Sequence, residues 1–177
     1  MSDISIITLN GKTPRIHPTA FIAPGCRIIG DVEIGEGASI WYNCVIRADV
    51  GPIRIGARSN IQDGSVVHCD AAPGFPTIIG EDALVGHLAM LHGCTVADRG
   101  FVGLGTIVMD GCTIESDAML AAGAMLTPGK TVPSGQLWGG RPARFMRDLD
   151  EAAIMGMRMG AAHYVHNAEV HKAALSG

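Results

Sequence analysis

The sequence predicts an all-β fold: a parallel β-helix of about six triangular coils, followed by one C-terminal α-helix. Three observations support this prediction. Aliphatic residues recur every six positions over most of the chain, glycine accounts for 24 of the 177 residues, and aromatic residues make up only 5%. A period of six fits neither a helix nor a single strand, but it fits a short strand followed by a tight corner. Three such units close one coil, and the small residues let the chain turn close to the coil axis.

The aliphatic residues of the repeat point inward and divide among three faces. The first face carries Ile22, Ile40, Ile61, Val85, Val102 and Leu120; the second carries Ile28, Ile46, Val67, Leu91, Val108 and Leu126; the third carries Ile34, Ile55, Ile79, Val96, Ile114 and Val132. One step of five residues, from Leu91 to Val96, interrupts the period. Cys26, Cys44 and Cys112 fall at inward positions, where they are expected to be small buried residues. Stacked coils are expected about 4.8 Å apart, like neighbouring strands.

The C-terminal part of the chain changes character. The repeat stops near Pro133, and residues 138–145 (WGGRPARF) are interpreted as a linker. Residues 145–174 are free of proline and rich in helix formers, which predicts one helix. One stripe at a spacing of four is expected to face the coil wall: Ala152, Gly156, Gly160 and Tyr164. We therefore divide the chain into a repeat domain, residues 1–140, and a linker and helix, residues 141–177, packed on it as one structural unit.

The overall composition limits the function classes. With 47% apolar residues, 17% charged residues and a net charge of −4, the chain is expected to be globular and not to bind nucleic acid. Residues 1–12 show no basic region followed by an apolar run, so we expect a cytoplasmic protein without a membrane segment. Five cysteines without a CxxC pair indicate neither a disulfide framework nor a four-cysteine zinc site.

Two histidines fall on one column of the second face. His68 follows Val67 and His92 follows Leu91, so both are expected to point outward. They are 24 residues apart, but residues 69–76 (CDAAPGFP) contain about six extra residues that form a loop. Without this loop the two histidines are one coil apart, and two imidazoles stacked in this way can bind one metal ion.

His87 lies around a corner, on the first face, and cannot readily share a metal with the other two within one chain. A neighbouring subunit supplies it if the first face of one subunit packs on the second face of the next, closing a three-fold assembly with three sites. Three neutral histidines and a water are typical of a catalytic zinc site. The alternatives are a structural site closed by Cys69 or Cys94, or histidines without a metal. The remaining histidines are expected on the surface: His17, His163, His166 and His171.

Two segments resemble the γ-class carbonic anhydrase family. They are residues 47–68 (RADVGPIRIGARSNIQDGSVVH) and residues 85–111 (VGHLAMLHGCTVADRGFVGLGTIVMDG), and the resemblance covers nearly the whole chain. It is to the short, housekeeping-type members, and it implies a left-handed β-helix and a homotrimer. The metal, Zn²⁺ with Fe²⁺ or Co²⁺ as possible substitutes, would be bound between subunits by His68, His87 and His92.

The resemblance also implies roles for other residues near the metal. Gln62, supported by Asn60, would hydrogen-bond the metal-bound hydroxide and aim it. Arg47 and Asp49 would form an ion pair at the interface, with a role in assembly or in catalysis; Asp63 is a second acidic partner for Arg47. Tyr164 resembles a tyrosine that lies near the site on the C-terminal helix.

The function implied is the reversible hydration of carbon dioxide to bicarbonate, the reaction of a metal-dependent lyase. The chain departs from the archaeal type in its short loop, where Asp70 is the only carboxylate, and in Val50, which replaces an acid. Buffer is therefore expected to carry the proton. The alternatives are a weakly active or non-catalytic metal-binding trimeric scaffold, and a hexapeptide acyltransferase or thioesterase. We expect a small-molecule substrate and neither a nucleic-acid nor a membrane partner.

Overall fold

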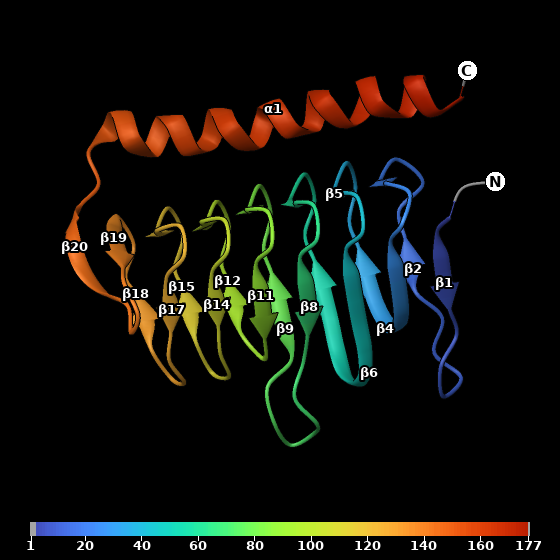
Figure 1. Ribbon diagram of the computed structural model, residues 1–177, viewed down its shortest axis with the longest axis horizontal. Helices are drawn as coiled ribbons and strands as arrows, with labels where there is room; N and C mark the ends of the chain where they lie inside the picture. Colours follow the sequence, from blue (N-terminus) through green and yellow to red (C-terminus); the bar gives the residue numbers. More distant parts are fainter. Residues whose placement is uncertain (1–2, 177) are drawn as a thin grey trace.

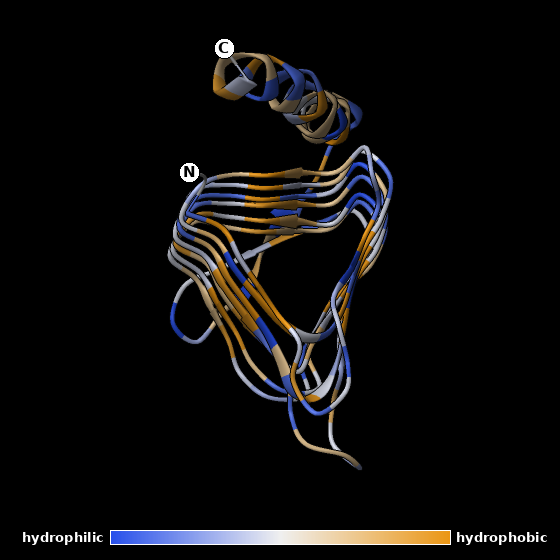
Figure 2. Ribbon diagram, turned by 90° about the vertical axis from the view of Figure 1, so that its right-hand side faces the viewer, coloured by the Kyte–Doolittle hydropathy of each residue, from blue (hydrophilic) through white to orange (hydrophobic). Residues whose placement is uncertain are grey.

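The computed structural model describes residues 3–176, which form a three-sided prism of parallel β-strands with one long helix laid along it (Figure 1). Seen end-on, the coils stack into a triangle, and the helix covers one of its three sides (Figure 2). The prediction of an all-β parallel β-helix with a C-terminal helix is confirmed.

Short strands stack in register on each side of the prism. The first face consists of β3 (Phe21–Ile22), β5 (Ser39–Ile40), β7 (Asn60–Ile61), β10 (Leu84–Val85), β13 (Phe101–Val102), β16 (Met119–Leu120) and β19 (Gln136–Gly139), and β20 (Arg144–Asp148) adds an antiparallel edge. The second face consists of β1 (Ser5–Ile7), β8 (Val66–His68), β11 (Met90–His92), β14 (Ile107–Val108) and β17 (Met125–Leu126). The third consists of β2 (Arg15–Ile16), β9 (Thr77–Ile79), β12 (Thr95–Val96), β15 (Thr113–Ile114) and β18 (Thr131–Val132). Two longer strands, β4 (Arg27–Ile34) and β6 (Val45–Ile55), bend around a corner and belong to both the second and the third face.

The strand register confirms the assignment of the aliphatic residues to three faces. On the second face, for example, Ile46 pairs with Val67, and Val67 pairs with Leu91. The inward side chains after the first coil are buried, and the thiols of the inward cysteines donate to carbonyl oxygens of the next coil, such as Cys26 Sγ to Trp41 O at 2.9 Å. All five cysteines are free and buried, and for Cys26, Cys44 and Cys112 this confirms the expected inward position.

The coil continues one turn further than expected. Among the described residues the first face has seven parallel strands, so the prism has about seven coils and not six. The last of these strands is β19, in which Trp138 pairs with Leu120 and takes the inward place that an aliphatic residue holds in the other coils. Because this coil closes the end of the prism, Trp138 is only partly buried and can be a large aromatic residue.

The segment that we interpreted as a linker is a β-hairpin, and the helix begins later than expected. Strand β20 pairs antiparallel with β19, with Phe145 opposite Trp138. Helix α1 spans Glu151–Ser176, and the carboxylate of Asp150 accepts a hydrogen bond from the backbone N–H of Ala153 at 2.8 Å. Such an acceptor at the N-terminus satisfies a free donor of the first turn, which is why the helix begins here and not at residue 145.

The helix packs along only part of the expected stripe. Gly160 and Tyr164 are partly buried, as expected, whereas Ala152 and Gly156 are exposed. The fully buried residues of the helix are Met157, Ala161 and Ala168. A helix has 3.6 residues per turn, so a strict spacing of four drifts by about 40° at each step and leaves the packed side. Among the described residues, no helix combines the length and the apolar character needed to cross a membrane.

Asp117 ties α1 to the prism. Its carboxylate accepts hydrogen bonds from Arg99, one coil before it, and from Arg158 of α1 at 3.0 Å. Burial opposes ionisation of Asp117, but these two guanidinium groups outweigh it and hold the pKa of Asp117 below its ordinary value. The side chain is only 15% exposed, so the pair is partly shielded from solvent.

We expect Asp117→Asn to lower the free energy of unfolding by about 2 kcal/mol at pH 7, because it removes charge-assisted hydrogen bonds. A carboxylate with a lowered pKa stabilises the fold above its unfolded pKa, and this contribution is lost as the pH falls through its folded pKa. The difference between wild type and variant should therefore shrink below about pH 4. Urea unfolding at pH 7 and at low pH measures it, with Glu36→Gln, an exposed carboxylate, as control. An equal difference at both pH values would contradict the role given to this charge.

Candidate metal centre

The two histidines of the second face lie side by side. His68 and His92 occupy paired positions in β8 and β11, and the eight residues between β8 and β9 form the expected loop at the edge of the prism (Figure 1). His68 Nδ1 and His92 Nε2 are 2.9 Å apart. The prediction that the two imidazoles stack across one coil is confirmed, and the loop correction that it required is correct.

Carboxylates occupy the outer ring nitrogens of this pair. Asp49 Oδ1 lies 2.8 Å from His68 Nε2, and Asp110 Oδ1 lies 2.5 Å from His92 Nδ1. If each outer nitrogen donates its proton to a carboxylate, both inner nitrogens of the neutral rings present lone pairs to each other. Two facing lone pairs are satisfied by a cation between them, either a shared proton or a metal ion, and metal-binding histidines show this same arrangement of a carboxylate on the nitrogen that does not bind the metal. The pair therefore fits a divalent metal ion.

His87 sits on the corner between the first and second faces. It follows Gly86, where a Cβ atom would come within 2.6 Å of the backbone nitrogen of Leu104 in the next coil, so the corner requires glycine. His87 Nδ1 lies 2.8 Å from Asp63 Oδ2, which leaves Nε2 free. Each of the three predicted ligands thus has a carboxylate on one ring nitrogen.

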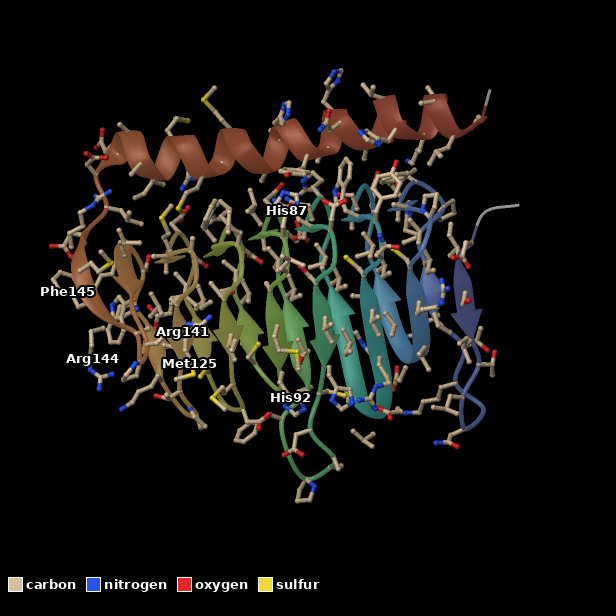
Figure 3. All side chains as sticks on the ribbon, in the orientation of Figure 1. His87, His92, Met125, Arg141, Arg144 and Phe145 are labelled. Carbon is tan, nitrogen blue, oxygen red and sulfur yellow. The ribbon has the colours of Figure 1, made fainter. Side chains whose placement is uncertain are left out.

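Within one chain the three histidines do not meet. Figure 3 shows His87 near α1 and His92 at the opposite edge of the second face. In residues 3–176 no three histidine, cysteine or acidic side chains are grouped closely enough to bind one metal ion. The sequence-based prediction that one chain cannot complete the site agrees with this geometry.

The proposed contact between whole faces is wrong, because α1 covers the first face. The helix lies against β3, β5, β7 and β10, and a Cβ atom on Gly160 would lie 3.4 Å from the side chain of Leu84. A neighbouring subunit therefore cannot pack on that face. The corner remains accessible: the side chain of His87 is 45% exposed, and Leu88 beside it is 70% exposed.

Asn60 and Gln62 lie on the same side of the prism as His87. Both are buried in β7 or directly after it, and Gln62 Nε2 donates to Asn60 Oδ1 at 3.0 Å. Asn60 Nδ2 in turn is 3.4 Å from the carbonyl oxygen of Ala83. The two amides thus hold each other in place, and neither touches the His68–His92 pair in one chain.

Tyr164 projects from α1 toward this same region. Its ring packs edge-on against Trp41, with centroids 5.3 Å apart. Burial, together with the negative charge of Asp63, raises the pKa of Tyr164 above its ordinary value. The phenol therefore keeps its proton at neutral pH and can act only as a donor or a neutral acceptor.

Arg47 and Asp49 lie beside the His68–His92 pair. The guanidinium of Arg47 contacts Asp49, and the same carboxylate binds His68. Burial opposes the charge on Asp49, but the hydrogen bonds from His68 and Arg47 hold its pKa below the ordinary value. In one chain Asp49 thus orients a histidine as well as pairing with Arg47, and Asp63 binds His87 and not Arg47.

Cys69 and Cys94 are buried thiols, and burial raises the pKa of each above its ordinary value. The thiol of Cys69 donates to the carbonyl oxygen of Gly51 at 3.1 Å. His171, expected on the surface, is half-buried: its ring packs on Trp41, and its Nδ1 lies 2.8 Å from the hydroxyl of Tyr42. The other three non-ligand histidines are exposed, as expected: His17, His163 and His166.

Asp110 was missed by the sequence analysis. It lies 18 residues after His92, whereas the coil from Leu91 to Val108 has 17 residues, so Asp110 is one residue beyond the position in register with His92. The repeat therefore indicated only that Asp110 lies near His92. Asp110 also falls within residues 85–111, the second segment that resembles the family.

Comparisons with known proteins agree with these features. Residues 13–48 match the family model described as bacterial transferase hexapeptide (six repeats). A carbonic anhydrase of Geobacillus kaustophilus is 46% identical over 168 residues, which cover 95% of this chain and 91% of that protein. A probable carbonic anhydrase of Methanocaldococcus jannaschii is 53% identical over 148 residues, covering 84% of this chain and 92% of that protein.

Plant relatives are longer. The chain is 42% identical to the mitochondrial gamma carbonic anhydrase 2 of Arabidopsis thaliana over 171 residues, covering 94% of the chain but only 62% of that protein. Among solved structures, a hexapeptide transferase family protein from Anaplasma phagocytophilum has a TM-score of 0.89 and 45% identity, covering 93% of this chain and 96% of that one. A putative acetyltransferase from Bacillus cereus has a TM-score of 0.95 and 38% identity, covering 98% and 99%.

Proposed function

The chain belongs to the γ-class carbonic anhydrase family, and from this premise we propose that it catalyses the reversible hydration of carbon dioxide to bicarbonate. The observation that supports this most is the set of carboxylates. His68, His87 and His92 each have an aspartate on one ring nitrogen, which leaves the other nitrogen for a metal. Structural histidines need no such uniform partner.

The metal proposed for this site is zinc, with Fe²⁺ or Co²⁺ as alternatives that accept the same nitrogen ligands. His68 and His92 of one subunit and His87 of the next would hold it, leaving a fourth position open, as in catalytic zinc sites. Bound there, zinc would lower the pKa of a coordinated water to about 7 and so supply a nucleophile at neutral pH.

A trimer is proposed because the second face carries an apolar column that no other element of the described residues covers. The outward side chains that form it are Val45, Val66, Met90, Ile107 and Met125. At the neighbouring corner Leu88 is 70% and Leu104 57% exposed. Apolar groups of this kind are expected to be buried against another copy of the chain. A corner-to-face contact repeated around a three-fold axis brings His87 to the His68–His92 pair of the next subunit.

The remaining residues divide between the two subunits of such a site. Gln62, Asn60 and Tyr164 come with His87, whereas Arg47 and Asp49 come with the other two histidines. Because Gln62 gives one amide N–H to Asn60, its amide oxygen and its second N–H are left to hydrogen-bond the attacking water and aim it. Asp49 keeps the ring of His68 oriented.

Proton release is proposed to depend on buffer. The loop carboxylate, Asp70, accepts a hydrogen bond from the backbone of Ala71 at 2.8 Å and so stabilises the loop. A dependence of the hydration rate on buffer concentration is therefore expected. The cytoplasmic location expected from the sequence stays a prediction.

The test is stopped-flow hydration of carbon dioxide by protein purified without oxygen and loaded with zinc, iron or cobalt. We expect turnover above the uncatalysed rate that a chelator abolishes. Metal binding without turnover would favour the non-catalytic scaffold, in which chelation lowers the melting temperature and nothing else.

Acyl transfer is the second candidate. The matched repeat family is described as a transferase, and the solved relative from Bacillus cereus is named a putative acetyltransferase. Release of free thiol from acetyl-coenzyme A, measured over a panel of amine and hydroxyl acceptors, separates the two functions. Acetyl transfer at a rate unchanged by chelation would replace the carbonic anhydrase proposal. Carbonic anhydrase stays the first candidate because three histidines with paired carboxylates exceed the needs of a transferase.

A further inference from the structure

Asp110 is the one carboxylate of the centre that comes from a coil beyond both paired histidines. It follows β14, and its Oδ1 lies 2.5 Å from His92 Nδ1. The geometry points to Asp110 as a positioning residue: we infer that it holds the ring of His92 so that Nε2 faces the metal position. This inference rests on the proposed function of the site and extends it to a residue with no role so far.

The hydrogen bond decides both the orientation and the tautomer of His92. An imidazole in a partly exposed position can turn by half a revolution about its Cβ–Cγ bond, and such a turn puts a ring carbon where each nitrogen was. A carboxylate is a stronger acceptor than water, so a proton on Nδ1 shared with Asp110 keeps Nε2 unprotonated and directed at His68 Nδ1, 2.9 Å away. Without Asp110, part of the protein would present a ring carbon or a protonated Nε2 to the metal position.

The backbone around Asp110 fixes this contact. Gly93, directly after His92, has a φ of +54°, and a Cβ atom there would lie 2.3 Å from Asp110 Oδ1. The N–H of Gly111 donates to the carbonyl oxygen of Gly93 at 2.8 Å, which ties the two turns together. The ring of Phe75, from the loop after β8, packs on the site where a Gly111 side chain would be, at 3.2 Å. Glycines thus make room on both sides of the carboxylate.

Asp110 differs from Asp49 in having a single task. Asp49 also binds Arg47, whereas within residues 3–176 the hydrogen-bond and ion-pair contact of the Asp110 side chain is with His92 alone. The side chain of Asp110 is 39% exposed, and ion pairs as exposed as this contribute little to stability. Removing it should therefore affect the metal centre and leave the fold intact.

The experiment compares Asp110→Ala and Asp110→Asn with wild type and with Asp148→Asn. Asp148 is an exposed aspartate whose side chain makes no hydrogen bond or ion pair within the described residues, so its variant controls for the change in net charge. Zinc affinity of the metal-free proteins is measured by competition with a chromogenic chelator. The visible spectrum of the cobalt-loaded proteins reports the ligand set, and the melting temperature of the metal-free proteins reports the fold.

We expect Asp110→Ala to bind zinc about 10- to 100-fold more weakly than wild type, with an altered cobalt spectrum and an unchanged metal-free melting temperature. The zinc affinity of Asp110→Asn, which keeps an acceptor oxygen but not the charge, should fall between those of Asp110→Ala and wild type. The zinc affinity of Asp148→Asn should equal that of wild type. Gly93→Ala, which displaces the carboxylate without removing it, should weaken zinc binding in the same direction.

Three results would overturn the inference. Zinc affinity of Asp110→Ala within twofold of wild type would remove the role of Asp110 while the proposed function stands. A loss of affinity matched by an equal loss of metal-free stability in both Asp110 variants would make the role structural. Wild-type protein that binds no zinc, iron or cobalt would refute both the inference and the proposed function.

Discussion

Replacing His92 by alanine is expected to reduce zinc binding and carbon dioxide hydration by more than about 100-fold, because it removes one of three proposed ligands and not merely an orienting group. The pairing of His92 with His68 leaves no other side chain at that position: in residues 3–176, the nearest alternative partner of His68 is Asp49 on its other nitrogen. Metal content and stopped-flow rates of wild type and variant measure the effect.

The matched control is His17→Ala, the same substitution at an exposed histidine whose Nδ1 contacts only Thr19. It should keep the metal content and rate of wild type. Hydration activity that survives His92→Ala at the wild-type level would show that the paired histidines are not the centre, whatever the family resemblance implies.

Mixing two inactive variants is expected to restore activity if the centre lies between subunits. His87→Ala lacks one part of every site, and His92→Ala lacks the other. In a trimer assembled from both, a site is complete where the intact His87 of one subunit meets the intact His68 and His92 of its neighbour. Random assembly of equal amounts gives about a quarter of the sites in complete form, and so about a quarter of the wild-type rate.

The control for this experiment is a mixture of His68→Ala with His92→Ala. These two histidines are paired positions of one chain, so no exchange of subunits can complete a site, and this mixture should stay inactive. Both mixtures are unfolded and refolded together, and activity is compared with the unmixed variants. Equal activity in the two mixtures would place the three histidines differently from the arrangement proposed here.

Much of the centre could be predicted because the repeat makes distance along the chain equivalent to distance in space. Within a coil of fixed length, residues separated by one period must be neighbours. His68 and His92 were paired in this way once the loop of residues 69–76 was subtracted, and the separation of His87 from them followed from the corner between the first and second faces. Asp110 lies one residue beyond the position that this rule gives for a neighbour of His92.

The C-terminal hairpin, the packed side of α1 and the burial of His171 could not be predicted, because they depend on contacts that the repeat does not specify. Strand β20 forms by pairing back onto β19, and Trp138 holds an inward place that the aliphatic pattern excludes. The packed side of α1 follows 3.6 residues per turn and the shape of the wall that it covers. His171 is half-buried because the ring of Trp41 packs against it, and no sequence pattern predicts that contact.

By itself, the sequence determined the coil, its three faces, and the register that stacks His68 on His92. These depend on local spacing, since each inward aliphatic residue dictates the direction of its own neighbours. Only the tertiary structure decided which face α1 covers, and hence that the proposed neighbour would approach at the corner of His87. It also decided which carboxylate each imidazole binds. The position of α1 and the carboxylate partner of each imidazole both depend on how side chains from distant segments compete for the same space and the same hydrogen bonds. A repeat of six residues carries no information about that competition.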